Sequence, residues 1–281
     1  MSPGNGSFVT EFILLSLTDQ PDLQLPLFFL FLVMYIVTVL GNLGLIILIV
    51  LNSHLHTPMY FFLFNFSFVD FCSSSVFTPK MLVDFLSKNN IILYMECMTQ
   101  LYFFCFFAIS ECYVLILGSY LMAFSGAMAH TGCMLRLTFC DANIINHYFC
   151  DILPLLQLSC TSTYVNKMVV FIVSGISVVV PSLTISVTYG FILSNILRIS
   201  STGGRSKAFS TCSSHIIAVS MFFGSGAFMY LNPSSSGSMD QGKISSVFYT
   251  NVVPMMNPFI YSLRNKDVKL ALRKILRRRK F

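Results

Sequence analysis

The feature that most constrains this chain is a series of apolar blocks separated by short polar gaps. The six blocks are residues 25–51, 58–82, 97–135, 165–196, 210–231 and 244–263. Five of them have the length of one helix across a hydrocarbon core about 30 Å thick. Only 10% of the 281 residues are charged, whereas a soluble domain carries about 25%. The sequence therefore predicts an all-α, multi-pass membrane protein.

The third block is too long for a single span. From Met98 to Leu135 the only formally charged side chain is Glu111. As one helix this run would be roughly 57 Å long, nearly twice the thickness of the hydrocarbon core. Two spans fit only if the chain turns tightly between them. We expect the turn at residues 117–119, because Gly118 tolerates turn geometry.

The charges at the two ends of the chain predict opposite sides of the membrane. Residues 1–24 contain a glycosylation sequon at Asn5 and no Lys or Arg. Three basic residues lie in 198–207 and nine in 264–281, together 12 of the 17 in the chain. Basic segments remain on the cytoplasmic side. An outer N-terminus and an inner tail require an odd number of crossings, so we expect seven spans with the third block folded as a hairpin.

The basic tail is also amphipathic. Apolar residues alternate with Lys and Arg over residues 265–281. This pattern predicts a short helix on the inner membrane surface, in contact with lipid headgroups. Nucleic acid is not an expected partner.

The polar loop at 136–164 holds three cysteines, spaced ten residues apart. They are Cys140, Cys150 and Cys160, and Cys97 lies at the start of the third block. Loop cysteines in a protein of the secretory pathway predict disulfides. A zinc site formed with His147 is the alternative. A disulfide between Cys97 and this loop would place both ends of the third block outside, which again requires a hairpin.

Two carboxylates, Asp70 and Glu111, lie within apolar blocks. An ionised group costs about 2.5–3.5 kcal/mol at the centre of a membrane helix and is usually functional. We expect a polar cluster with Asn42 and Asn257 and a candidate site for a sodium ion near Asp70 and Glu111. A protonated carboxyl that is hydrogen-bonded in the bundle is the alternative. No nucleophile–base pair or metal spacing accompanies these acids, so neither an enzyme nor another cofactor is predicted.

Five motifs resemble the olfactory receptors, a branch of the rhodopsin-like G-protein-coupled receptors. They are "GNLGLIILI" at 41–49, "LHTPMYFFLFNFSFVD" at 55–70, "CDANIINHYFCDILPLLQLSC" at 140–160, "KAFSTCSSH" at 207–215 and "PMMNPFIYSLRN" at 254–265. They occur in the family's order over nearly the whole chain. The resemblance implies one seven-helix domain, residues 1–281, in the plasma membrane. Its N-terminus (1–24) and second outer loop (136–164) would be extracellular and its tail (264–281) cytoplasmic.

The resemblance also implies roles for individual residues. The disulfides would be Cys97–Cys150 and Cys140–Cys160. A small volatile odorant would bind in the outer half of the bundle, near Phe104, Ala108, Ile109, Phe223 and Tyr230, although interhelical packing is the alternative for each. The central switch would comprise Asn42, Asp70, Glu111, Asn257, Pro258 and Tyr261. A heterotrimeric G protein of the stimulatory olfactory type would meet Lys207, Ser210, Thr211 and His215.

The sequence departs from the family between helices three and four. The family follows "SECYVL" with "MAYDRYVAICNPL" and a basic inner loop, but here residues 110–115 run almost directly into "LGSYLMAFSG" at 117–126. We therefore expect both helices to be shortened, their inner loop to be missing and G-protein coupling to be impaired. The alternatives are a family member that does not signal and an ion-coupled transporter. The absence of an internal repeat argues against the transporter.

Overall fold

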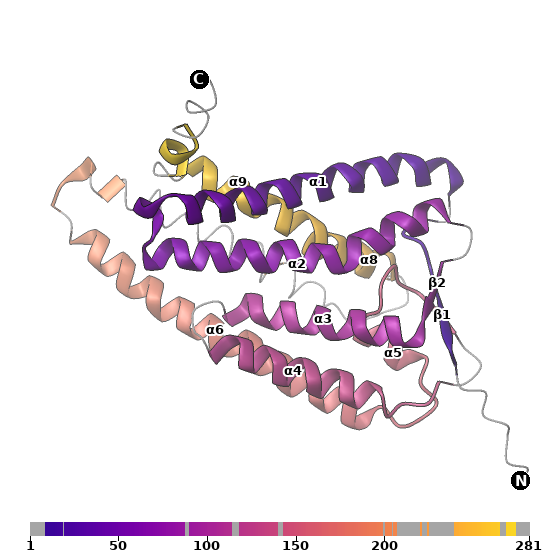
Figure 1. The fold of residues 1–281 in the computed structure, drawn as a ribbon. Coiled ribbons are helices and arrows are strands. Elements are labelled where there is room, and N and C mark those ends of the chain that lie inside the picture. Colours follow the sequence, from indigo (N-terminus) through magenta and orange to yellow (C-terminus); the bar gives the residue numbers. More distant parts are fainter. Residues whose placement is uncertain are drawn as a thin grey trace, which may run out of the picture. The chain divides into compact units, whose positions relative to one another are not determined.

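The computed structural model covers the whole chain and describes most of it. The described residues are 9–18, 20–87, 90–113, 118–139, 143–198, 200–203, 205–206, 220, 224, 239–264 and 268–273. Their contacts form two compact units. Unit 1 is Met1–Val33 with Ser75–Ser177, and unit 2 is Met34–Ser74 with Val178–Phe281. Figure 1 labels the helices and strands of the chain.

Within the described residues, helices occupy the predicted apolar blocks, and their ends differ from the predicted ends by a few residues. The elements are α1 (Pro21–Leu51), η1 (Ser53–Leu55), α2 (Pro58–Leu86), α3 (Tyr94–Tyr113), α4 (Gly118–Met134), α5 (Ile152–Gln157), α6 (Tyr164–Leu197), α8 (Met239–Val247), η2 (Phe248–Val252) and α9 (Val253–Arg264). Within the described part of the chain, α1, α6 and residues Tyr60–Leu86 of α2 have the length and hydropathy of membrane spans. The block at 210–231 lies almost entirely outside the described residues.

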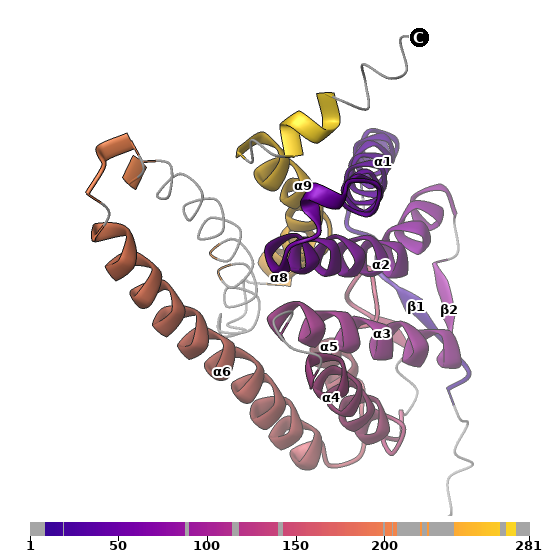
Figure 2. The ribbon, with the colours of Figure 1, turned by 60° about the vertical axis from the view of Figure 1, so that its left-hand side comes forward.

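The third block is two antiparallel helices, as predicted. In Figures 1 and 2, α3 and α4 run side by side. The rings of Phe106 and Tyr120 lie 6.3 Å apart, and so do those of Tyr102 and Phe124. From the first pair to the second, the residue number falls by four on α3 and rises by four on α4, so the two helices run in opposite directions. Gly118 already belongs to α4, so the expected bend at 117–119 was placed too late. The connection is residues 114–117, which are outside the described part.

Unit 1 contains a small sheet that the sequence did not predict. Its strands are β1 (Glu11–Leu14), β2 (Ile91–Leu93) and β3 (Ile144–Ile145), in the order β2-β1-β3. β1 is antiparallel to β2 and parallel to β3. Phe12 and Ile92 are register partners and both are buried. The sheet joins the N-terminal segment to two loops, so the fold is an α-helical bundle with a minor β-element.

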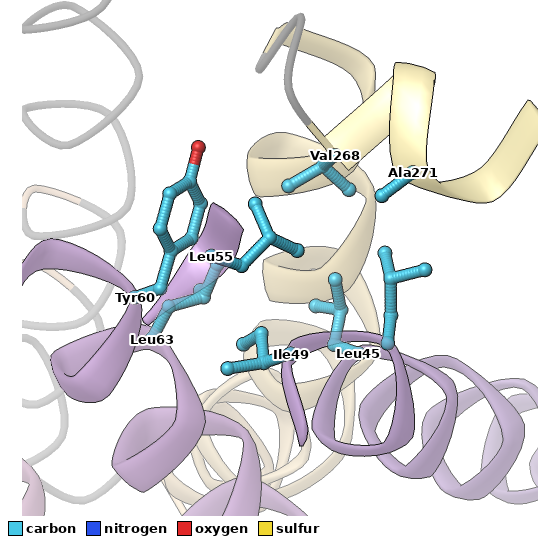
Figure 3. Close-up of a cluster of buried hydrophobic side chains, with 8 residues drawn as sticks. Leu45, Ile49, Leu55, Tyr60, Leu63, Val268 and Ala271 are labelled. Carbon is cyan, nitrogen blue, oxygen red and sulfur yellow. The ribbon is translucent and has the colours of Figure 1, made fainter. Parts of the chain in front are cut away.

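The core of unit 2 includes the start of the basic tail. Residues 268–273 are helical, and Val268 and Ala271 are buried (Figure 3). They pack in a cluster whose other members are Leu45, Leu48, Ile49, Leu55, Tyr60 and Leu63. Leu270 and Leu272 remain exposed. One part of the tail's apolar surface therefore packs on α1, η1 and α2, and only the rest is available to lipid.

Candidate functional site

Two predicted switch residues meet directly in unit 2. The Asn257 side-chain amide of α9 donates a 2.9 Å hydrogen bond to the Asp70 carboxylate of α2. Asp70 is 1% exposed and Asn257 is 4% exposed. A buried carboxylate is costly without such a donor. The bond therefore both satisfies Asp70 and joins α2 to α9.

Asn42 repairs the backbone where Pro258 interrupts α9. Proline has no N–H, so the carbonyl four residues earlier, that of Pro254, loses its helical partner. The Asn42 side-chain amide donates to this carbonyl at 3.1 Å and to Thr38 O at 3.0 Å. Asn42 is fully buried. Its position on α1 thus compensates for the proline and fixes α1 to α9.

The same region of unit 2 is closely packed and irregular. A Cβ atom on Gly41 would lie 3.1 Å from the Pro258 ring, so glycine permits the approach of α1 to α9. The turn before α9, η2, is a π-helix. Single π-helical turns are common at functional sites, because they change the direction of the side chains that follow. The geometry is suited to a change in helix direction near Asn257.

An aromatic cluster joins α2, α3 and the second outer loop in unit 1. The ring of Phe104 lies 5.5 Å from that of Phe77 and 5.3 Å from that of Phe149. The rings of Phe77 and Phe149 are 5.1 Å apart. Gln100 holds the loop in place, since its oxygen accepts from the Cys150 amide at 2.9 Å and its nitrogen donates to Val76 O at 3.4 Å.

The loop is also held covalently. Cys97 and Cys150 form a disulfide, the pairing that the resemblance implied. Cys160 is disulfide-bonded as well, and its expected partner Cys140 lies outside the described residues. Two of the cysteines in the zinc alternative are therefore in disulfides. Among the described residues no group of three or more His, Cys, Asp or Glu could hold a metal ion.

Asp151, next to this disulfide, is a buried acid outside the spans. It is 2% exposed, and its carboxylate accepts from the Ile152 amide at 2.7 Å, at the N-terminus of α5. Burial raises its pKa from 3.8 to about 6, and the bond from Ile152 opposes this shift. The loop therefore contains a carboxyl that titrates close to neutral pH.

Known proteins are similar to this chain in sequence or in fold. The family model for olfactory receptors matches residues 31–131 and 127–279. Olfactory receptor 8B3 of Homo sapiens is 66% identical over 97% of this chain and 96% of its own length. Olfactory receptor 8B8 of Mus musculus is 64% identical over the full length of both chains. The crystal structure of squid rhodopsin covers 91% of this chain and 85% of its own, with a TM-score of 0.66 and 14% identity.

The chain belongs to the olfactory receptor family. It therefore has the seven-helix fold of rhodopsin, is a multi-pass membrane protein and is a receptor with no enzymatic activity.

The comparison also bears on the expected loss within this olfactory receptor. Olfactory receptor 8B8 of Homo sapiens aligns over 310 positions that cover the whole of both chains, and this chain has 281 residues, so 29 positions have no residue here. The two parts of the family match meet at residues 127–131, within α4. The alignment with known olfactory receptors is therefore interrupted, and a deletion at the α3–α4 connection remains a prediction.

The structure groups some predicted site residues of this olfactory receptor and leaves others apart. Asn42, Asp70, Asn257 and Pro258 lie together in unit 2, and Glu111, 8% exposed, belongs to unit 1. The sodium site that needs Asp70 and Glu111 remains a prediction. Outside the described residues lie Asn5, Cys140, Lys207, Ser210, Thr211, His215, Phe223, Tyr230 and the side chain of Tyr261.

The candidate ligand residues on α3 have different surroundings. Phe104 belongs to the aromatic cluster, Ala108 is half-buried, and Ile109 contacts α4 near Gly126. The sequence missed Gln100, Phe77 and Phe149. Their apolar context gave no signal that they would meet, because the contact depends on how the second outer loop folds back onto α3.

Proposed function

We propose that this chain is an odorant receptor that binds small volatile molecules in the outer half of its bundle. Its membership of the olfactory receptor family over nearly its whole length carries this proposal. The aromatic cluster around Phe104 supports an apolar ligand, since pockets for small molecules are lined mainly by aromatic and aliphatic groups. A ligand that contacts Phe104 would also feel the position of the second outer loop, because Phe149 lies against the same ring.

The proposed orientation has the N-terminus outside and the tail in the cytoplasm of a plasma-membrane protein. The positive-inside rule supports it, since residues 264–281 hold nine basic residues. The disulfide adds support, because Cys97 lies in the first turn of α3 and Cys150 follows α4. Disulfides form on the oxidising side, so the hairpin would begin and end outside.

Signalling would pass to a heterotrimeric G protein of the stimulatory olfactory type. Ligand binding would shift a two-state bundle, and the contacts at Asp70–Asn257 and Asn42–Pro254 are suited to differ between the states. A sodium ion near Asp70 would favour one of these states. The G-protein surface would include the inner end of the sixth helix of the family, residues 207–215.

We infer further that coupling is impaired. Only residues 114–117 connect α3 to α4, and the motif that the family places at the inner end of helix three is missing. At about 1.5 Å per residue, α4 is roughly 26 Å long, less than the thickness of the hydrocarbon core. The hairpin turn would therefore lie at the inner membrane surface or within the bilayer, and it would present no loop to a G protein. A family member that binds ligand without signalling is the second candidate.

A paired experiment separates binding from coupling. The chain and a version that carries the second inner loop of Olfactory receptor 8B8 after residue 115 are expressed at matched surface levels, and cyclic AMP is measured over an odorant panel. We expect odorant responses from the restored version and weak or absent responses from the native chain. Equal responses would refute impaired coupling, and silence of the restored version at full surface expression would count against the odorant-receptor proposal.

A further inference from the structure

The outer loop between α2 and α3 has an unusual surface in unit 1. Five large apolar side chains are exposed along it: Val83 58%, Leu86 64%, Ile91 38%, Leu93 53% and Met95 65%. We call this set the outer strip. Val83 and Leu86 lie one turn apart at the end of α2, Ile91 and Leu93 share one face of β2, and Met95 begins α3.

Part of the polar backbone of β2 is bonded within the protein, on the side of the strand that faces β1. β2 is an edge strand of the sheet. On either side of β2, Asn90 O accepts from Leu14 N of β1 and Tyr94 N donates to Thr10 O, just before β1. Because backbone groups alternate in direction along a strand, those of Ile91 and Leu93 point to the free edge. An edge of this kind normally needs water or another strand.

Charged side chains occupy this free edge. The Lys80 ammonium of α2 donates to Ile91 O at 3.0 Å, and the Leu93 amide donates to the Glu96 carboxylate of α3 at 3.2 Å. Lys80 is also paired with Asp84 one turn along α2. Two of the four backbone groups at this edge, Ile91 O and Leu93 N, are therefore already bonded to side chains. This disfavours strand addition by another chain and lowers the cost of bringing β2 close to lipid.

The outer strip is continuous with surfaces that lie in the bilayer. Val83 and Leu86 are the last exposed apolar residues of α2, which has the composition of a membrane span. Met95 opens the exposed flank of α3, where Phe103 is also exposed two turns later. In Figure 1, β2 lies where α2 ends and α3 begins. The strip therefore extends the lipid-facing surface of two helices into the loop that joins them.

We propose that β2 and the outer strip lie in the outer leaflet, at the boundary between headgroups and acyl chains, and that the partner of this surface is lipid. Ile91 and Leu93 enter the acyl region. Lys80, Asp84 and Glu96 remain at headgroup level, where Lys80 and Glu96 keep their bonds to Ile91 O and Leu93 N. The loop then acts as a lipid anchor for the sheet and, through β1, for the N-terminal segment.

The absence of tryptophan from the chain makes this testable by fluorescence. Single variants Ile91→Trp and Leu93→Trp are made in the full chain and placed in phosphatidylcholine nanodiscs whose acyl chains carry bromine either near the headgroup or near the chain end. We expect loss of fluorescence with shallow bromine, a smaller loss with deep bromine and little quenching by aqueous iodide. Tryptophan is tolerated at this depth of a membrane.

Two variants provide controls. Leu121 of α4 is 74% exposed, and Leu121→Trp should respond more to deep bromine. Phe12 lies on the buried face of the sheet, and Phe12→Trp should respond to neither bromine nor iodide. Met95→Trp serves as a third reporter of the strip if a β2 variant does not fold, as judged by the Cys97–Cys150 disulfide. Strong iodide quenching without bromine quenching would refute the proposal in favour of solvent. Bromine quenching that disappears as receptor density rises would refute it in favour of a second copy of the chain.

Discussion

At the scale of single residues, hydrogen bonds to α9 account for three buried polar side chains of unit 2, those of Asn42, Asp70 and Asn257. Pro258 removes one donor from α9, and the Asn42 amide replaces it at Pro254 O. Asn257 then satisfies Asp70, 2.9 Å away. A buried polar group without a partner costs about 1–3 kcal/mol. These asparagines are therefore required by the proline and the acid, and their positions follow from chemistry that the sequence displays.

Asn42→Ala should destabilise the receptor by about 1–3 kcal/mol, because Pro254 O becomes a buried acceptor with no donor. Thermal unfolding of the purified chain in detergent measures the effect. Asn65→Ala is the matched control. The Asn65 amide also donates to a backbone carbonyl, that of Phe61, but at an exposed position within one regular helix. An equal loss in both variants would contradict the compensating role of Asn42.

Asp151 should make the stability of the chain depend on pH. Its pKa in the folded protein is about 6, above the ordinary value of 3.8, because burial disfavours the carboxylate. The folded state therefore binds the proton more tightly than the unfolded state. The stabilisation is complete below about pH 4 and is lost as the pH rises through 6. The full difference is on the order of 3 kcal/mol.

Thermal midpoints of the native chain and of Asp151→Asn between pH 4.5 and 7.5 measure this contribution. Asparagine also serves as a helix N-cap but does not titrate. The midpoint of the native chain relative to the variant should fall as the pH rises. A constant difference across the range would show that Asp151 does not titrate there.

At the scale of elements, the α3–α4 hairpin depends on close packing at one glycine. A Cβ on Gly126 of α4 would lie 2.6 Å from Ile109 Cδ1 and 3.3 Å from Val173 Cγ1 of α6. A Cβ on Gly132 of the same helix would meet nothing within 4 Å. Helical Gly→Ala changes otherwise stabilise by roughly 0.5–1 kcal/mol. The two glycines therefore separate packing from helix propensity.

Gly132→Ala should raise the thermal midpoint, whereas Gly126→Ala should raise it less or lower it, because overpacking costs about 1–3 kcal/mol. Ile109→Val removes the Cδ1 atom that the new methyl group meets. The double variant Gly126→Ala, Ile109→Val should therefore recover stability relative to the sum of its single changes. Simple additivity would show that Ile109 does not limit the approach of α3 to α4.

The elements show which parts of the fold were accessible from the sequence. Apolar length predicted α1, α2, α6 and the helices from Met239 to Arg264, because a bilayer forces backbone polar groups to bond within each span. Charge parity predicted the α3–α4 hairpin. The β-sheet was not predicted, since strands of two to four residues form only when distant segments meet. The exact turn was missed because Gly118 is as acceptable at the start of a helix as in a bend.

The candidate site divides in the same way. Asp70, Asn42 and Asn257 were recognisable, because polar groups in apolar helices must find one another. The bond from Gln100 to Cys150 and the rings around Phe104 were not, since they depend on the path of the second outer loop. Amphipathicity predicted the tail helix, but the burial of Val268 and Ala271 against η1 requires knowledge of how the inner turn folds.

At the scale of the whole molecule, the charge distribution, the Cys97–Cys150 disulfide and the family all bear on how many times the chain crosses the membrane. The native sequon at Asn5 is modified only if the N-terminus reaches the lumen during synthesis. If the third block is a hairpin, residue 118 faces the cytoplasm and the segment after Cys160 faces the lumen. If that block were a single spanning helix, its two ends would lie on opposite sides of the membrane, and the segment after Cys160 would face the cytoplasm. Glycosylation of a tag at each of these positions therefore reports the side of the membrane on which that position lies.

A glycosylation tag with flexible spacers is inserted at residue 118 in one variant and after Thr161, which is exposed, in another. Asn5→Gln is included in both, so that the inserted tag is the one glycosylation acceptor outside the spans of each chain. We expect the tag after Thr161 to be modified and the tag at 118 to remain unmodified, as shown by the gel shift that endoglycosidase removes. The chain with its native Asn5 and no tag should also be modified. Modification at 118 would contradict the hairpin, because it would place the α3–α4 turn on the lumenal side. Modification both at Asn5 and after Thr161 requires an even number of crossings between these two sites. The four spans α1, α2, α3 and α4 provide that number.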